Sequence, residues 1–118
     1  QEAGAVALAL PPEYYRQLAE GYRARRDRLV PALEAAGFRC FRPRGAYYVM
    51  TDIAAFNYPS DQEFARTLVQ EAGVAAVPGS SFYHHPRDGA TQLRFAFCKR
   101  DATLDEAARR LAKIPRRA

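Results

Sequence analysis

The sequence predicts a mixed α+β fold, in which a small and mostly antiparallel sheet carries helices packed on one of its faces. The first observation behind this prediction is the order of patterns along the chain: helix, two strands, helix, two strands, helix. The second is size and composition, since 118 residues with 48% hydrophobic and 26% charged side chains are typical of one globular domain. We therefore expect a single domain over residues 1–118.

A long amphipathic helix is predicted over residues 11–36. Pro11 and Pro12 suit its first turn and Gly37 suits its end, whereas Pro31 lies inside it and predicts a kink. About 24 residues at 1.5 Å each give a length of roughly 36 Å, so the helix should reach beyond its own domain. Residues 1–10 are interpreted as part of a further helix that the chain includes only in part. The apolar stripe of the long helix is formed by Tyr15, Leu18, Tyr22, Leu29, Leu33 and Ala36.

The middle of the chain predicts a hairpin and then a helix. Residues 38–42 and 47–51 are short β-rich runs separated by a turn that contains Gly45. Ser60 and Glu63 have capping-box spacing, and they predict a helix over residues 60–72 that ends at Gly73.

The remainder predicts two more strands and a final helix. The strands are expected at 74–77 and 92–98, on either side of a long loop over 78–89 that is rich in Gly, Pro and His. Thr103 and Glu106 predict a second capping box, and Leu104, Ala108 and Leu111 should form the buried face of the final helix.

Charge and cysteine content indicate which binding partners and which cellular location to expect. The net charge is +5, but sixteen of the 18 basic residues are arginines spread along the chain, with short clusters at 23–28 and 116–117. Acidic residues interleave with most of them, which favours a solvated surface over a nucleic-acid partner. The apolar runs are too short for a membrane span. Cys40 and Cys98 have no CxxC spacing and predict free buried thiols in a reducing cytoplasm.

Arg94 is the most informative single residue. It lies between Leu93 and Phe95 on a predicted strand and faces the opposite side, where Tyr48 should also point. An arginine in such a place costs desolvation energy unless it is paired, and its planar fork suits a carboxylate. The partner could be a bound ligand or, as the alternative, an acidic residue of the same domain.

A second functional class competes with ligand binding, because the run Arg94-Phe95-Ala96-Phe97 has some likeness to the aromatic strand of an RNA-recognition motif. That motif exposes its aromatic rings and has a glycine that is missing here. The two classes therefore differ in one observation: an exposed Phe95 would support RNA binding, and a buried Phe95 would oppose it.

Several motifs, in order along nearly the whole chain, resemble one protein family. They are the long helix, Tyr47-Tyr48 on the second strand, VPGSSFY at 77–83 and LRFAFCK at 93–99. Together they resemble the carboxy-terminal, or small, domain of the class I/II aminotransferases, which use pyridoxal 5'-phosphate and share the aspartate-aminotransferase fold. Within the family, the sequence resembles the kynurenine and methionine aminotransferase branch. In that family, the segment matching 1–36 includes the long interdomain helix.

The resemblance implies roles for three residues of this chain. Arg94 would grip the α-carboxylate of the substrate, Tyr48 would line the pocket, and Gly79 would let a loop approach it closely. The catalytic lysine and the groups that hold the cofactor belong to the family's large domain, so no catalytic, cofactor-binding or metal residue is assigned here. The chain alone should be inactive, and the complete enzyme should be a homodimer that transfers an amino group from an amino acid to a 2-oxo acid.

Overall fold

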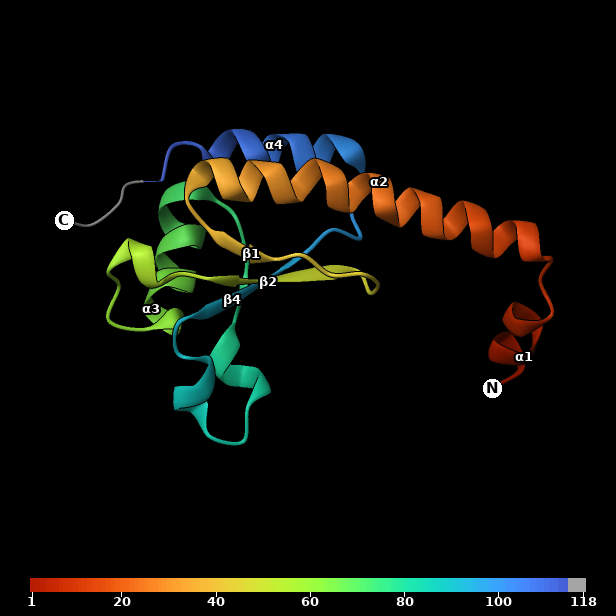
Figure 1. Ribbon diagram of the computed structural model, residues 1–118, viewed down its shortest axis with the longest axis horizontal. Coiled ribbons are helices and arrows are strands. Elements are labelled where there is room, and N and C mark those ends of the chain that lie inside the picture. Colours follow the sequence, from red (N-terminus) through yellow and green to blue (C-terminus); the bar gives the residue numbers. More distant parts are fainter. Residues whose placement is uncertain (115–118) are drawn as a thin grey trace.

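The computed structural model describes residues 1–114, so the predicted basic pair Arg116 and Arg117 lies outside the described residues. A four-stranded antiparallel sheet, in the order β1-β2-β4-β3, carries helices on one face (Figure 1). The expected fold class is therefore confirmed. The helices are α1 (Glu2–Leu8), α2 (Pro12–Ala36), α3 (Asp61–Thr67) and α4 (Asp101–Leu111), and the strands are β1 (Arg39–Phe41), β2 (Tyr48–Asp52), β3 (Val77–Pro78) and β4 (Gln92–Ala96).

The pairing of β2 with β4 determines which side chains share a face. Val49 lies opposite Phe95 and both are buried, whereas Met50 lies opposite Arg94 and both are partly exposed. Side chains alternate along each strand, so the first pair points into the helices and the second pair points to the open face. Tyr48, two residues before Met50, lies on the same open face as Arg94.

A cluster of phenylalanines fills the space between the sheet and the helices. Phe38 is central, and its ring centroid lies 4.6 Å from that of Phe56 and 5.2 Å from that of Phe95. Phe38 reaches this position because Gly37 ends α2 in the left-handed conformation, with φ of 103°. Leu29 and Leu33 of α2 complete the buried layer.

Helix α2 extends beyond the domain, as its length predicted. Its C-terminal half is anchored by buried residues, while residues 12–20 are exposed throughout, including Tyr15 and Leu18 at 40% each. The helix continues through Pro31 to Ala36. Figure 1 shows α1, a separate short helix, next to the N-terminal end of α2. The Tyr15 hydroxyl of α2 donates a hydrogen bond to the Ala7 carbonyl of α1.

Helix α3 begins as expected but continues differently. Ser60 accepts a hydrogen bond from the Glu63 N–H at 3.1 Å, which confirms that part of the predicted capping box. After Thr67 the chain forms a π turn, η2 (Leu68–Ala72), before Gly73 ends it with a positive φ.

The second predicted capping box is wrong. Helix α4 begins at Asp101, so Thr103 is inside the helix and Arg100 occupies the cap position without a side-chain bond. The Glu106 carboxylate instead accepts hydrogen bonds from Arg109 and Arg110, at 2.6 and 2.7 Å, which lower the pKa of Glu106 to about 2. These charge-assisted bonds at positions i+3 and i+4 replace the capping bond.

Three smaller expectations also need correction. Strand β3 comprises only Val77–Pro78, because the preceding residues follow the end of the π turn without pairing. Strand β4 ends at Ala96, and the chain then turns toward α4, which leaves Cys98 exposed. Cys40 is partly buried, and both thiols are free.

Candidate functional site

Arg94 occupies the centre of the open face. Its strand, β4, lies between β2 and β3, and Arg94 is paired with Met50 on one side and Val77 on the other. A side chain at such an internal position is held by backbone pairing on both flanks. The sheet therefore fixes where the guanidinium emerges.

Two aromatic rings lie close to the guanidinium. Its central carbon lies 4.4 Å from the ring centroid of Phe82 and 5.1 Å from that of Tyr48. Tyr48 belongs to β2, and Phe82 ends a short 3-10 turn, η3 (Gly79–Phe82). Both contacts are within the range of cation–π attraction, which contributes about 0.5–2 kcal/mol depending on solvation. The rings restrict the guanidinium without using its hydrogen-bond donors.

One donor of Arg94 is buried and unsatisfied. Among the buried side-chain nitrogen and oxygen atoms of residues 1–114, the Nε of Arg94 is the one without a hydrogen-bond partner. No carboxylate among the described residues forms an ion pair with Arg94 either, so the intradomain salt bridge is not observed there. Leaving a charged donor unpaired in this way is unfavourable. The geometry thus favours an acceptor from outside the described chain.

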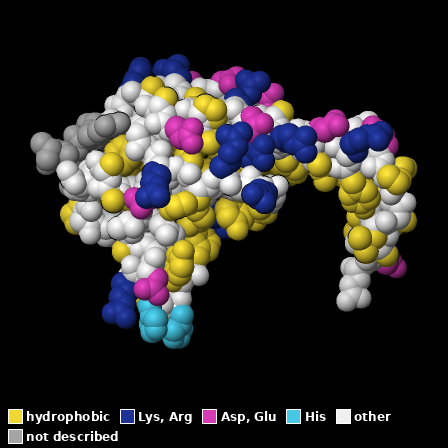
Figure 2. Space-filling model, viewed as in Figure 1, with side chains coloured by type: hydrophobic (Ala, Val, Ile, Leu, Met, Phe, Trp, Pro, Cys, Tyr) yellow, Lys and Arg dark blue, Asp and Glu magenta, His cyan; other side chains and the backbone are white. Residues whose placement is uncertain are grey.

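A cavity of about 260 Å³ opens beside the guanidinium. Tyr83 contributes to its wall and is oriented by its hydroxyl, which donates to Gln92 Oε1 at 2.9 Å. Figure 2 shows hydrophobic side chains gathered along the loop whose tip carries the two histidines. Since Arg94 is the only charged residue of the lining, the cavity combines one cationic fork with apolar walls. It is lined by Tyr48, Met50, Phe82, Tyr83 and Arg94.

Gly79 does not line this cavity. It is buried at the base of the loop, where a Cβ would lie 2.5 Å from Gln92 Cβ and 2.6 Å from the Gly89 carbonyl oxygen. Its missing side chain therefore permits close packing against Gln92 and Gly89, whereas the expected close approach to the substrate pocket stays a prediction. Sequence reasoning missed the rings of Phe82 and Tyr83. The signal available was an aromatic pair just after a predicted tight turn.

The RNA alternative fails its own criterion. Phe95 is 3% exposed and Phe97 is 1% exposed, so neither ring is available for stacking on a base. The open face presents Arg94 and Tyr48 instead.

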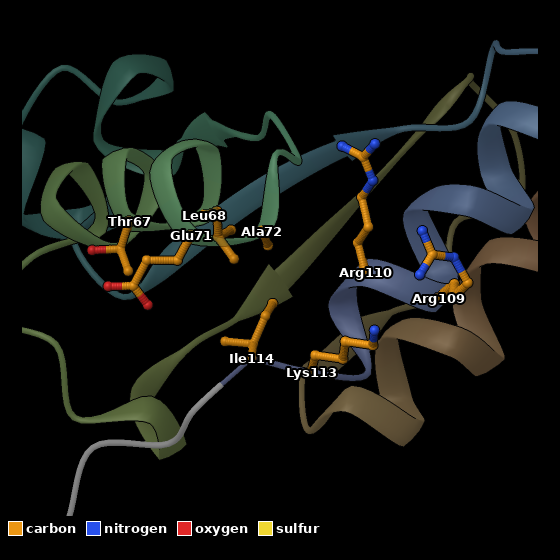
Figure 3. Close-up of a pocket in the computed structure, with 8 residues that line it drawn as sticks. All are labelled: Thr67, Leu68, Glu71, Ala72, Arg109, Arg110, Lys113 and Ile114. Atoms are coloured by element: carbon orange, nitrogen blue, oxygen red, sulfur yellow. The ribbon is translucent and has the colours of Figure 1, made fainter.

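Two other hollows, one larger and one smaller than the Arg94 cavity, lie beside α4, and each is lined by one lysine. Lys99 lines a hollow of about 640 Å³ beside α4, and Lys113 lines one of about 110 Å³ between α3–η2 and α4. Figure 3 shows the second hollow, with Glu71 on one side and, on the other, Arg109 and Arg110, the two arginines that Glu106 binds. Neither lysine lines the Arg94 cavity. His84 and His85 contact each other on the exposed loop, and residues 1–114 contain no cluster of three potential metal ligands.

None of the helices described for residues 1–114 is both long enough and apolar enough to cross a membrane.

Curated proteins with similar sequences are aminotransferases. Methionine aminotransferase of Escherichia coli is 38% identical over 97% of this chain and 29% of its own length. Kynurenine--oxoglutarate transaminase of Dictyostelium discoideum is 34% identical over 97% of this chain and 31% of its own length. The chain thus spans about three tenths of the length of these relatives.

Solved structures agree with the sequences. N-Succinyldiaminopimelate aminotransferase from Mycobacterium tuberculosis matches with a TM-score of 0.84 and 40% identity, over 94% of this chain and 29% of that one. Aspartate aminotransferase from Thermus thermophilus, solved with maleate, matches with a TM-score of 0.69 and 36% identity, over 80% of this chain and 23% of that one. The family model described as aminotransferase class I and II covers residues 1–111, and this chain therefore belongs to the class I and II aminotransferase family.

Proposed function

We propose that this chain is the small, substrate-binding domain of a pyridoxal-phosphate-dependent aminotransferase, and that Arg94 binds the carboxylate shared by the amino-acid and 2-oxo-acid substrates. The observation that carries the proposal is the buried, unpartnered Nε of Arg94 beside a cavity of about 260 Å³. A carboxylate in the cavity would accept two N–H bonds from the guanidinium, in the bidentate geometry that arginine favours. Maleate bound to the related Thermus thermophilus enzyme is itself a dicarboxylate.

The roles of the surrounding residues follow from their contacts. Phe82 and Tyr48 both contact the guanidinium, which lowers the conformational freedom that binding must remove. Met50 and Tyr83 form part of the apolar wall of the cavity, so a substrate that enters displaces water from it. Arg94 thereby positions a substrate, and positioning of a reacting molecule is a large part of enzymatic rate acceleration.

The cofactor must be held elsewhere in the enzyme. Pyridoxal phosphate supplies the electronic chemistry of amino-group transfer and is attached to a lysine. The described residues do not fit this task around Arg94, because Lys99 and Lys113 line other hollows. We therefore place the cofactor-binding groups outside this chain, and the chain alone should be inactive. Borohydride reduction with pyridoxal phosphate should attach no stoichiometric pyridoxyl group to either lysine, and such an adduct would contradict the assignment.

The partners and location that complete the proposal are those of the family. The amino donor is a neutral, aromatic or sulfur-containing amino acid, since Arg94 is the single cation of the lining and no second one is present for a distal carboxylate. The complete enzyme is a cytoplasmic homodimer. The names of two relatives, with kynurenine and methionine, agree with this substrate class, whereas the aspartate and N-succinyldiaminopimelate aminotransferases are named for substrates with a further carboxylate.

The test is substitution of Arg94 in the complete enzyme. Arg94→Ala should lower kcat/KM for amino acids by on the order of a hundredfold, which corresponds to about 3 kcal/mol for a lost charge-assisted pair. Arg94→Lys keeps the charge but loses the fork, and it should recover only part of the loss. An unchanged kcat/KM in Arg94→Ala would exclude the proposed role.

A further inference from the structure

A single residue closes the base of the loop that carries Phe82. Asp61, the first residue of α3, accepts the Ser80 N–H on its Oδ2 at 2.8 Å. Its own backbone N–H donates to the Ala90 carbonyl at 3.1 Å. Both ends of the segment 80–90 are therefore bonded to Asp61, although α3 lies about twenty residues earlier in the sequence.

The burial of Asp61 is unusual for its position. An aspartate in the first turn of a helix is ordinarily exposed, where it interacts with the helix dipole at little cost. Asp61 is 2% exposed, and none of the ion pairs among the described residues includes it. A buried carboxylate without a cation is unfavourable unless hydrogen bonds satisfy it. Its two oxygens accept the N–H groups of Gln62 and Ser80.

Helix capping does not account for this arrangement. Ser60 already caps α3 by accepting the Glu63 N–H. The bond from Ser80 lies outside the helix, so what the buried carboxylate adds is a connection from α3 to η3.

The connection leads directly to the Arg94 cavity. Ser80 is the second residue of η3, and the preceding Gly79 packs its backbone against Gly89 with no space for a side chain. Two residues after Ser80, the ring of Phe82 lies over the Arg94 guanidinium. A turn of only four residues has few internal bonds of its own, so its orientation depends on contacts such as the one to Asp61.

We propose that Asp61 is a positioning residue for the carboxylate site: its buried carboxylate fixes η3 through the Ser80 N–H and thereby holds Phe82 against Arg94. This inference rests on the proposed function of Arg94. It assigns Asp61 no contact with substrate.

The experiment compares Asp61→Asn with Ser60→Ala in the complete enzyme. Asp61→Asn keeps the size of the side chain but replaces an accepting oxygen by an NH₂ group, which cannot satisfy both N–H donors. Ser60→Ala removes the neighbouring helix cap without touching η3, so it controls for destabilisation of α3. The probe is 3-phenylpropionate, a monocarboxylate with no amino group, measured as the inhibition constant Ki against the amino-acid substrate.

We expect Asp61→Asn to raise Ki and KM by about tenfold with a smaller change in kcat, and Ser60→Ala to leave Ki unchanged. In an Arg94→Ala background, Asp61→Asn should have no further effect on Ki, because its action passes through Arg94. A purely structural role would lower thermal stability while leaving Ki unchanged, and that result would overturn the proposal.

The outcomes separate the two proposals. If Arg94→Ala itself leaves Ki unchanged, the proposed function fails. If Arg94→Ala raises Ki but Asp61→Asn behaves like Ser60→Ala, only the role of Asp61 fails. Should Asp61→Asn not fold, Asp61→Ser, which also loses the carboxylate but is smaller, is measured in the same way, and equal Ki values for Asp61→Ser and Ser60→Ala count against the proposal.

Discussion

The ring of Phe82 lies over the guanidinium of Arg94, with 4.4 Å between the ring centroid and the central carbon. The two residues come from different kinds of element, a strand paired on both sides and a four-residue turn. Strand β4 fixes the position of the Arg94 guanidinium, whereas the turn η3 places the ring of Phe82 against it. The precision of the site therefore depends on how the turn is held.

Phe82→Leu tests the contribution of the ring. Leucine keeps most of the apolar area but has no π face, so the affinity of Arg94 for a carboxylate should fall by about two- to tenfold. The matched control is Phe41→Leu, since Phe41 is similarly exposed, at 45% against 46%, and contacts Arg39, which lies outside the cavity. The measurement is the Ki of 3-phenylpropionate, and an equal effect of both substitutions would contradict the prediction.

Gly79→Ala tests the close packing at the base of the loop. The new Cβ would lie 2.5 Å from Gln92 Cβ and 2.6 Å from a backbone oxygen of Gly89, so the backbone must shift. Overpacking of this kind costs about 1–3 kcal/mol, which lowers Tm by several degrees in a domain this small. Gly45→Ala is the control, because nothing lies within 4 Å of its Cβ position. Equal Tm values for the two variants would refute the packing argument.

Burial of the Cys40 thiol should make the free energy of unfolding depend on pH in the alkaline range. Burial, together with the charge of Glu34, raises the pKa of the Cys40 thiol to about 11 from an ordinary value of 9.0. Between these values the folded state holds more protons than the unfolded state, so the stability that Cys40 contributes is present below pH 9 and is lost as pH rises toward 11. The free energy of unfolding should thus fall less steeply over this range in Cys40→Ala than in the unmodified chain. Cys98→Ala, at an exposed thiol, should retain the steep fall, and identical slopes in all three proteins would disprove the assignment.

A donor panel tests the substrate class on the complete enzyme. Methionine, phenylalanine and kynurenine should be better amino donors than aspartate and glutamate, because Arg94 is the single cation lining its cavity. If aspartate or glutamate exceeded them by tenfold in kcat/KM, about 1.4 kcal/mol of transition-state preference, the substrate class would be wrong although Arg94 could keep its role.

The parts of the fold that were predictable have strong local patterns. The apolar stripe of α2 and the alternation around Arg94 each repeat over several residues, so periodicity alone identifies the element and the face. The alternation of side chains was the most useful pattern for the site, because it predicted that Arg94 and Tyr48 point away from the core. Their distance from each other required the register of β2 on β4, which no single strand encodes.

The errors share a physical origin. Thr103 and Glu106 have capping-box spacing, but Arg109 and Arg110 compete for the same carboxylate with stronger, charge-assisted bonds. Asp61 illustrates the same limit, since its sequence context indicates a helix start and nothing nearby indicates the bond to Ser80. Contacts between distant segments decide such cases, and spacing within one segment does not reveal them.

The exposed half of α2 makes the helix a lever. Residues 12–20 are exposed, while Leu29, Val30 and Leu33 fix the other end in the core. A helix rises about 1.5 Å per residue, so the free end stands roughly 25 Å from the anchor. A tilt of about 5° at the anchor would displace that end by about 2 Å by this geometry. Because the anchor residues pack in the core against the sheet, a small rotation of the sheet that carries Arg94 is magnified into a displacement of about this size at the far end of α2.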